Sequence, residues 1–325
     1  MLKLSKSVAL ALSTLALVMH SALAMAGEST KSVAVTAIVE HPALDSARDG
    51  VLAALNEAGY IEGKNLRWQY QSAQGNTATA AQIARKFIGD RPDAIVGIAT
   101  PSAQALVAGT RRIPIVFTAV TDPVGAQLVK SWEATGSNVT GVSDVLELER
   151  QIELIREILP QARKVGMVYN PGEANSVAVV NALKQLLPQY DMQLLESAAP
   201  RTVDVGSAAR SLVGKVDVIY TNTDNNVVSA YEALAKVGND TKTPLIASDT
   251  DSVSRGAIAA LGMDYYDLGK QTGRMVVRIL EGENPGSIAP QTSENVQLFI
   301  NPGAARKQGV ELPPELIERA TQVIQ

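Results

Sequence analysis

The sequence predicts an α/β protein of two similar lobes, each built on a doubly wound parallel sheet, joined by a hinge. Short, continuous apolar runs rich in Val and Ile alternate with helical patterns. Such runs are typical of strands buried on both faces of a parallel sheet. Strand–helix–strand repetition gives right-handed βαβ units. Because the order of these units in the first half recurs in the second, we expect two lobes of similar architecture.

The N-terminus predicts export. Lys3 and Lys6 precede an apolar run over residues 8–18, and small residues then form A-x-A sites at 22–24 and 24–26. This is the layout of a secretory signal peptide, and the apolar run is shorter than the roughly 20 residues that a membrane span needs. The alternative is a buried N-terminal helix. We expect residues 1–26 to be removed and the mature protein to be periplasmic.

The composition limits the classes of function. The chain has 325 residues, a formal net charge of −4 and no cysteine. The length suits two domains, and the charge offers no basic face for nucleic acid. Without cysteine there is neither a disulfide framework nor a site for lipid attachment, so the core must hold the fold. A soluble exported protein is retained near the cell only by an outer membrane, which favours a Gram-negative periplasm.

The predicted strands follow one another in two groups. The first lobe has apolar runs at 33–39, 94–99 and 113–117, and the second has runs at 165–169, 216–220, 244–247 and 257–261. Amphipathic helices are predicted at 43–58 and 147–159 from the spacing of their apolar residues. The segment 93–122 resembles the segment 217–249, with a strand, a polar end, a helix and a second strand in each. This internal similarity predicts a lobe junction near residues 141–146.

The last part of the chain completes both lobes and does not form a third domain. We expect a helix over 264–281, ended by Gly and Pro, then a strand over 295–300. Pro313 and Pro314 predict the start of a closing helix. The expected division is residues 27–143 plus 264–290 for the N-terminal lobe and 144–263 plus 291–325 for the C-terminal lobe.

Polar residues follow the predicted strands at their carboxyl ends, where open parallel sheets bind ligands. Thr100 and Ser102 offer hydroxyls beside helix N-terminal amides, which favours a carboxylate. The acids Asp122, Asp224 and Asp249 suit an ammonium group, so together these ends fit a zwitterion. The other candidates at strand ends are His41, Thr121, Asn175, Ser176 and Asn225. The same residue types are also the usual helix N-caps, so each one has a purely structural alternative.

Signatures of enzymes are absent from the sequence. Of the two histidines, His20 lies in the signal segment, so a Ser-His-Asp arrangement could use only His41. No H-E-x-x-H, C-x-x-C or P-loop motif occurs, and we expect no metal and no cofactor. Tyr265 and its neighbour either line the hinge or pack beneath it.

Read in order, several segments resemble the tryptophan-type (TrpX-like) solute-binding proteins of ABC transporters. The matching segments cover nearly the whole mature chain and lie at 40–50, 59–65, 99–106, 118–129, 138–144, 169–176, 220–227 and 263–273. The resemblance implies a type I periplasmic-binding fold that closes on an amino-acid-like ligand. Structurally studied relatives of this kind bind aromatic amino acids.

The resemblance also implies roles for residues of this chain. It places Thr100, Ser102 and Ala103 at the ligand carboxylate, with Asn175 and Ser176 facing them from the other lobe. Asp224 is the first choice for the ligand amine. Pro42, Leu44, Pro101 and Tyr265 would supply apolar walls, and Asp45 lies in the matching segment 40–50.

The predicted function is therefore solute binding for an ABC importer, and not catalysis. The protein would act as a monomer, bind a small amino-acid-like ligand and deliver it to a permease in the inner membrane. Two alternatives from other classes are a sensor that presents its bound state to a membrane receptor, and a hydrolase or dinucleotide enzyme. A sugar-repressor-type transcription factor shares the fold, but the signal peptide and the absence of a helix-turn-helix argue against it.

Overall fold

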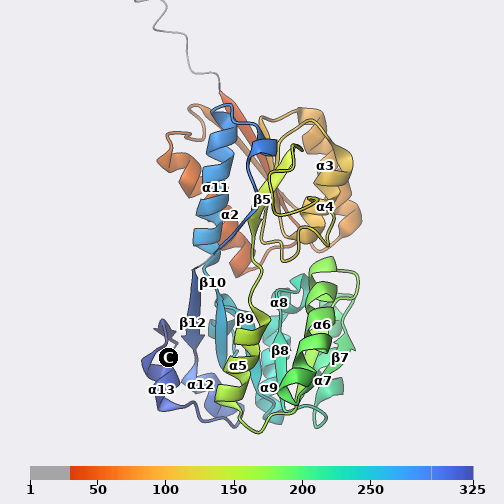
Figure 1. Cartoon of the computed structure of the whole chain (residues 1–325), viewed down its shortest axis with the longest axis vertical. Helices are drawn as coiled ribbons and strands as arrows, with labels where there is room; N and C mark the ends of the chain where they lie inside the picture. Colours follow the sequence, from red (N-terminus) through yellow and green to blue (C-terminus); the bar gives the residue numbers. More distant parts are fainter. Residues whose placement is uncertain (1–29, 294, 325) are drawn as a thin grey trace, which may run out of the picture.

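The computed structural model describes residues 30–293 and 295–324, and it contains two α/β lobes stacked along the long axis of the molecule (Figure 1). Each lobe has its own sheet with helices on both faces. The predicted fold class is confirmed. The predicted signal segment, residues 1–26, lies outside the described residues.

The first lobe is built on a parallel sheet with the strand order β11-β5-β4-β3-β1-β2. Strands β3, β4 and β5 are buried along their whole length, and for β3 and β4 this explains why their sequences read as continuous apolar runs. The strands are β1 (Lys31–Ala37), β2 (Leu66–Ser72), β3 (Ala94–Ile98), β4 (Ile115–Thr118), β5 (Val139–Ser143) and β11 (Gln291–Thr292).

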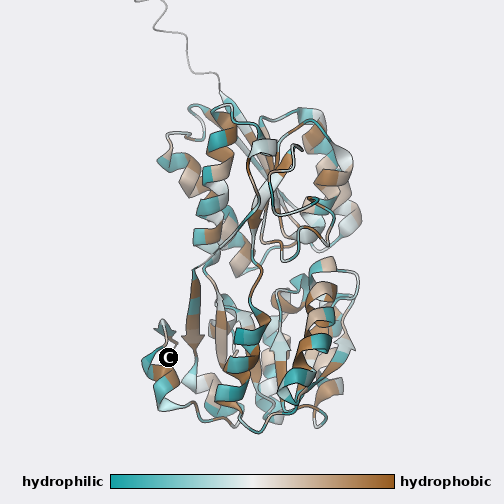
Figure 2. Ribbon diagram, in the orientation of Figure 1, coloured by the Kyte–Doolittle hydropathy of each residue, from teal (hydrophilic) through white to brown (hydrophobic). Residues whose placement is uncertain are grey.

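Two pairs of helices cover the two faces of this sheet. Helices α2 (Pro42–Glu57) and α11 (Tyr265–Leu280) pack on one face, and α3 (Thr77–Asp90) and α4 (Thr100–Gly109) pack on the other (Figure 1). Helix α11 comes late in the chain, so it ties the C-terminal part of the sequence into the first lobe. The helices are polar on the outside and apolar towards the sheet (Figure 2).

The second lobe has a seven-stranded sheet with the order β13-β12-β10-β9-β8-β6-β7. All neighbouring strands are parallel except β10 and β12, which pair antiparallel. The strands are β6 (Lys164–Tyr169), β7 (Gln193–Ala198), β8 (Val218–Thr221), β9 (Leu245–Asp249), β10 (Ala259–Met263), β12 (Val296–Ile300) and β13 (Gln322–Val323).

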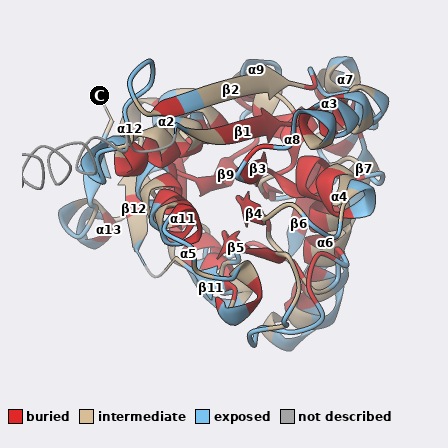
Figure 3. Ribbon diagram, turned by 90° about the horizontal axis from the view of Figure 1, so that it is seen from above, coloured by how far each residue is buried: buried red, intermediate tan, exposed pale blue. Residues whose placement is uncertain are grey.

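Helices α5 (Leu148–Ile158) and α6 (Ala174–Leu186) enclose one core of this lobe, and α7 (Val205–Leu212) and α9 (Tyr231–Thr241) enclose the other. The central strands are red in Figure 3 because both of their faces are covered. The remaining helices are short: α8 (Asn225–Ser229), α10 (Asp251–Ser254), α12 (Pro302–Lys307) and α13 (Pro314–Glu318), with 3-10 turns at Leu187–Tyr190, Thr202–Asp204 and Pro285–Ser287.

The chain passes between the sheets from β5 to α5, from β10 to α11 and from β11 to β12. The first passage falls in the junction predicted near residues 141–146. Sheet membership differs from the expected boundary at 290/291 by two residues, since Gln291 and Thr292 pair with Val142 and Ser143 of the first sheet. The division of the chain into domains otherwise stays a prediction.

Close packing fixes α11 against α2. A Cβ atom on Gly269 would lie 2.1 Å from the carbonyl oxygen of Ala47, and one on Gly273 would lie 2.7 Å from that of Val51. Only glycine permits this approach of two helix backbones. The contact holds the first residue of α11, Tyr265, at the edge of the gap between the lobes.

Candidate ligand-binding cleft

A cavity lies between the lobes where the carboxyl ends of their strands face each other. Protein atoms leave about 300 Å³ of space there, part of it open to solvent. Residues at or just after the ends of β1, β3, β4, β5, β6, β8, β9 and β10 line it, as expected for open parallel sheets. The lining residues are His41, Ala43, Leu44, Ala99, Ala119, Asp144, Asn175, Thr223, Asn225, Val228, Asp249 and Tyr265.

The start of α4 presents unused hydrogen-bonding groups beside this cavity. Ala99, the N-cap, has no side chain that could cap the helix. The hydroxyl oxygens of Thr100 and Ser102 are buried and have no hydrogen-bond partner among the described residues. A helix N-terminus with two free hydroxyls favours an anion. Like Thr100 and Ser102, both Pro101 and Ala103 are buried beside the cavity without lining it, and the backbone N–H of Ala103 already donates to Ala99.

The backbone is strained where β3 and β4 meet the cavity. Ala99 has a φ of 70° and Ala119 a φ of 53°, in the left-handed region that favours glycine. Strain of this kind costs on the order of 1–3 kcal/mol per residue and persists where the surroundings enforce it. Both residues line the cavity, so the strain is concentrated at its wall.

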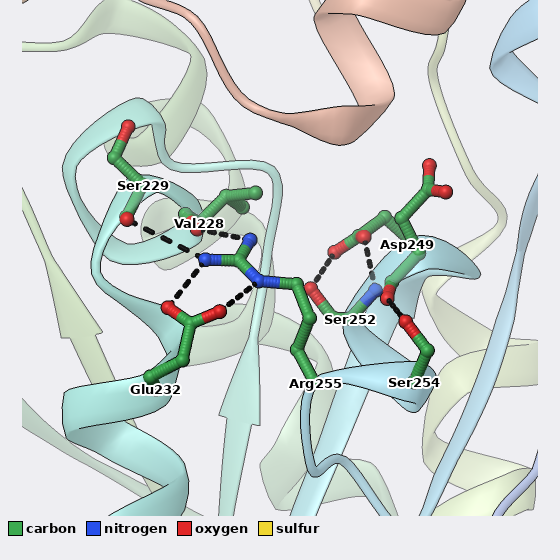
Figure 4. Close-up of polar contacts among 8 residues, drawn as sticks. Val228, Ser229, Glu232, Asp249, Ser252, Ser254 and Arg255 are labelled. Atoms are coloured by element: carbon green, nitrogen blue, oxygen red, sulfur yellow. Dashed lines mark hydrogen bonds and ion pairs between the residues drawn. The ribbon is translucent and has the colours of Figure 1, made fainter.

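Asp249, the last residue of β9, is a buried acid whose carboxylate oxygens can accept further hydrogen bonds. The backbone N–H and the hydroxyl of Ser252 donate to its two oxygens, at 2.9 and 2.7 Å. A carboxylate has about four acceptor positions, so others remain. Burial raises the pKa of Asp249, and the nearby Arg255 partly opposes this. The Arg255 guanidinium is itself bound by Glu232 and by the carbonyls of Val228 and Ser229 (Figure 4).

Asp144 follows β5 and is held by two residues of the first lobe. Its carboxylate accepts hydrogen bonds from the hydroxyls of Thr121 (3.0 Å) and Tyr265 (2.8 Å). The Thr121 hydroxyl also lies 3.5 Å from that of Thr223, so a polar contact spans the gap between the lobes. Burial raises the pKa of Asp144, against the effect of the hydrogen bonds from Tyr265 and Thr121. Asp144 is therefore a second buried acid at the cavity.

Asp224 occupies a different position from the one expected of an amine ligand. It caps α8, with one oxygen accepting from the N–H groups of Asn226 and Val227 and the other from Asn170 N–H and the Ser176 hydroxyl. Four donors fill its acceptor positions, and it does not line the cavity. Ser176 likewise points at Asp224 and not at the cavity. Asp224 therefore has the structural role of a helix cap.

Glu173 holds the two asparagines of the second lobe that do line the cavity. Its carboxylate accepts from the amides of Asn175 (3.2 Å) and Asn225 (2.6 Å). Burial, and to a lesser degree the charge of Asp224, raises the pKa of Glu173 to about 7. The amide oxygen of Asn175 is buried without a hydrogen-bond partner in the part of the chain that the structure describes, so it is available to a ligand.

His41 caps α2, because its Nδ1 accepts from the backbone N–H of Leu44 at 3.5 Å. Burial, with a smaller effect of Arg255, lowers its pKa to about 3. The imidazole is therefore neutral, and since Nδ1 is the acceptor, Nε2 carries the proton. Tyr265 both lines the cavity and supports Asp144, which answers the question whether it lines the hinge or packs beneath it.

Three further predicted residues, Asp45, Thr121 and Asp122, do not line this cavity. Asp45 pairs with Arg48 on the half-exposed side of α2, 3.0 Å away. Asp122 accepts from Gly125 N–H and lines a neighbouring cavity, as does Thr121. The sequence reasoning missed six lining residues: Ala43, Ala99, Ala119, Asp144, Thr223 and Val228. The strand-end rule would have included Asp144 if β5 had been recognised as a strand.

The neighbouring cavity lies on the α5/α6 side of the second sheet. It spans about 840 Å³, part of it open to solvent, between α6, the β5–α5 crossover and the segment 121–132 of the first lobe. Asp144 and Thr223 line both cavities. The two cavities therefore adjoin at these two residues.

The fold and the cleft define a two-lobed solute-binding protein, with polar groups from both lobes converging on an enclosed space. Residues 32–324 match the family model described as ABC transporter substrate binding protein. The chain belongs to this family, whose members bind solutes and are not enzymes.

Individual relatives agree with this assignment. A tyrosine-binding protein of Clostridioides difficile is 42% identical over 271 residues, covering 83% of this chain and 79% of the relative. A conserved domain protein from Vibrio cholerae is 51% identical with a TM-score of 0.90, covering 91% of this chain and 100% of that one. A Streptococcus domain in complex with L-Trp is 31% identical with a TM-score of 0.87 and the same coverage.

More distant solved structures share the fold alone. A glucose-galactose binding protein from Geobacillus stearothermophilus is 15% identical with a TM-score of 0.62. This likeness supports the type I periplasmic-binding architecture and carries nothing about the ligand. No helix in the described residues has the length and apolarity to cross a membrane.

Proposed function

We propose that the protein is the periplasmic receptor of an ABC importer and that it binds an L-amino acid with an aromatic side chain between its lobes. The observation that carries this proposal is the cavity between the lobes: two buried acids, Asp144 and Asp249, line it, and the start of α4 beside it holds the two free hydroxyls of Thr100 and Ser102. The tyrosine-binding and L-Trp-bound relatives support the aromatic class.

In this proposal the ligand carboxylate lies at the start of α4, where Thr100 and Ser102 donate hydrogen bonds. The ammonium group lies between Asp249 and Asp144, whose burial makes an unpaired negative charge unfavourable and a bound cation favourable. The amide oxygen of Asn175 accepts a further ammonium proton. We therefore assign the ligand amine to the two acids that line the cavity, and not to Asp224, whose carboxylate oxygens already accept hydrogen bonds from protein donors.

The lobes supply complementary halves of this site, so closure depends on the ligand. Thr100 and Ser102 belong to the first lobe, and Asn175 and Asp249 belong to the second. A zwitterion that contacts both halves stabilises the closed form by its differential affinity for the two states. Because both walls come from one chain, we propose a monomer that presents the closed form to a permease.

A thermal-shift screen of the standard amino acids tests the ligand class, with tyramine and 4-hydroxyphenylpropionate as analogues that each lack one charge, and with D-glucose as the control. An amino acid that fits should stabilise the protein by about 2.7 kcal/mol at a hundredfold excess over Kd. We expect L-tyrosine or L-tryptophan to raise Tm and both analogues to fail. No shift with any amino acid, or a shift with glucose alone, contradicts the proposal.

A further inference from the structure

We infer that the neighbouring cavity receives the ligand's side chain and selects aromatic rings that carry a polar group at the tip. This rests on the proposed function, which places the amino and carboxylate groups in the enclosed cavity. The two spaces meet at Asp144 and Thr223, which line both. A ligand whose ammonium lies at Asp144 therefore has its side chain next to the second cavity.

The walls of the neighbouring cavity suit a flat apolar group. Leu146 and Leu148 line it from the crossover and the start of α5, and Ala178 and Ala182 line it from α6. The two alanines are four residues apart, so they lie on one face of the helix and leave a strip free of larger side chains. Trp132, which is 41% exposed, lies at the first-lobe side. Such walls favour an aromatic ring.

The inner end of this cavity is polar. Asn222 follows β8 and Ser248 lies near the end of β9, and both side chains line the space while being 2% and 3% exposed. Asn222 Oδ1 and Ser248 Oγ have no hydrogen-bond partner in residues 30–293 and 295–324. Ser248 also lies near the Tyr220 phenol. Burial raises the pKa of this phenol, and Ser248 partly offsets that rise. No hydrogen bond of good geometry joins the two side chains.

Buried polar atoms without partners are costly unless a ligand satisfies them. A phenol hydroxyl or an indole N–H can donate to Asn222 Oδ1, and a phenol can also accept from Ser248. Phenylalanine offers neither interaction and would leave both oxygens unpaired. Sites built to bind a hydroxyl or N–H reject the analogue that lacks it far more strongly than they reject a change of size.

Titration calorimetry on the whole mature chain with L-tyrosine, L-tryptophan, L-phenylalanine and L-alanine tests the inference. Wild type should bind tyrosine or tryptophan at least about tenfold more tightly than phenylalanine. Ser248→Ala should reduce the preference for tyrosine over phenylalanine to about threefold or less, without weakening phenylalanine. The loss of affinity is expected only for tyrosine, the ligand that would use the Ser248 hydroxyl.

A filling variant tests where the side chain lies. Ala178→Phe should weaken the aromatic ligands by about thirtyfold or more, because the new ring occupies their space. Ala233→Phe is the matched control, since Ala233 is an exposed residue of α9 outside both cavities. Ala182→Leu is the milder second variant, to be used if melting shows that Ala178→Phe is unfolded.

The outcomes separate the inference from the proposed function. If wild type binds aromatic amino acids but does not prefer those with a polar tip, or if the filling variants bind them like the Ala233 control, the inference is overturned and the proposed function stands. If wild type binds no amino acid at all, the proposed function fails, and the inference fails with it.

Discussion

At the scale of single residues, the number of protein donors on a buried acid tells whether it can serve a ligand. Asp224 and Asp249 both end up buried after a strand of the second lobe, and the sequence does not distinguish them. Asp224 already accepts from four donors, whereas Asp249 accepts from one residue only. The expected consequences of substituting the two are therefore opposite.

Asp249→Asn should weaken binding of the amino-acid ligand by about thirtyfold or more, because truncating one partner of a buried charge pair costs roughly 2–5 kcal/mol. The Asn amide oxygen can still accept from Ser252 N–H, so the fold should survive. Calorimetry with the best ligand of the thermal-shift screen measures the loss. An affinity within about threefold of wild type would remove Asp249 from the amine site.

Asp224→Asn is the matched substitution, and for it we expect a loss of stability with little change in ligand affinity. Two of its four accepted hydrogen bonds are lost when an oxygen becomes an NH₂ group, because each oxygen accepts two, and a buried donor such as the Asn170 backbone N–H is left without its acceptor. The free energy of unfolding should fall by about 1–3 kcal/mol, while ligand affinity stays within about threefold. Urea unfolding and calorimetry on the same variant check both. A large loss of affinity without a loss of stability would return Asp224 to the ligand site.

Glu173 should make stability depend on pH between about 4.5 and 7. Its pKa rises from an ordinary value of 4.5 to about 7 on folding, mainly through burial, so the folded state favours the protonated form. Its contribution is therefore fully present below pH 4.5 and is lost as the pH rises through 7, by up to about 3 kcal/mol. Burial shifts the pKa of Asp144, Asp224 and Asp249 in the same direction.

Urea unfolding at pH 5 and pH 8 measures this dependence. Glu173→Gln should flatten it, because glutamine resembles the protonated acid at both pH values. Glu62→Gln, at an exposed glutamate, is the control and should behave like wild type. If Glu173→Gln keeps the full wild-type difference between pH 5 and pH 8, Glu173 is not the group responsible.

At the scale of helices and strands, the contact between α2 and α11 sets the position of Tyr265 and hence of Asp144. Gly269→Ala places a Cβ atom 2.1 Å from a backbone carbonyl that cannot move independently of its helix. We expect a loss of about 1–3 kcal/mol in unfolding free energy, as for an overpacked core. Denaturant unfolding checks this value.

Gly89→Ala in α3 is the control for this substitution, since nothing lies within 4 Å of its added methyl. It should leave the protein as stable as wild type or raise its stability by up to about 1 kcal/mol through helix propensity. If both variants behave alike, the close approach of α2 and α11 does not limit stability.

Strands with continuous apolar runs and helices with a regular apolar spacing could be predicted from the sequence, and strands of polar or mixed composition could not. The helices expected at 43–58, 147–159 and 264–281 correspond to α2, α5 and α11 within one or two residues. The edge strands β2 and β7 were missed because they are mostly half-exposed and polar in composition. Strand β5 was missed because its sequence, with Thr, Gly and Ser, reads as a turn although the strand is buried.

The residues of the candidate site could also be predicted only in part from the sequence. The strand-end rule identified Thr100, Ser102, Asn175 and Asp249 as groups at or beside the cavity, because it depends only on where strands end. It could not tell a free acid from a capping one, since that depends on donors more than 45 residues away, such as Ser176 for Asp224. The positive φ of Ala99 and Ala119 also has no sign in the sequence.

At the scale of the whole molecule, the fold is consistent with a protein that works outside the cytoplasm, as its family does. We expect the abundant cellular form to begin at Met25 or Gly27, because export would remove the charged and apolar N-terminal segment. N-terminal sequencing of the periplasmic fraction checks this. Met1 on the abundant form would contradict the expectation of export.

The enclosure of the cavity by both lobes has a kinetic consequence. A ligand that contacts both the start of α4 and the end of β9, as proposed, must lose its contacts with one lobe before it leaves. Its dissociation rate can then never exceed the rate at which the lobes part, a motion of microseconds to milliseconds in hinged proteins. Residence time would thus be set by the hinge as well as by affinity, and a membrane partner that pulls the lobes apart would shorten it without competing for the ligand.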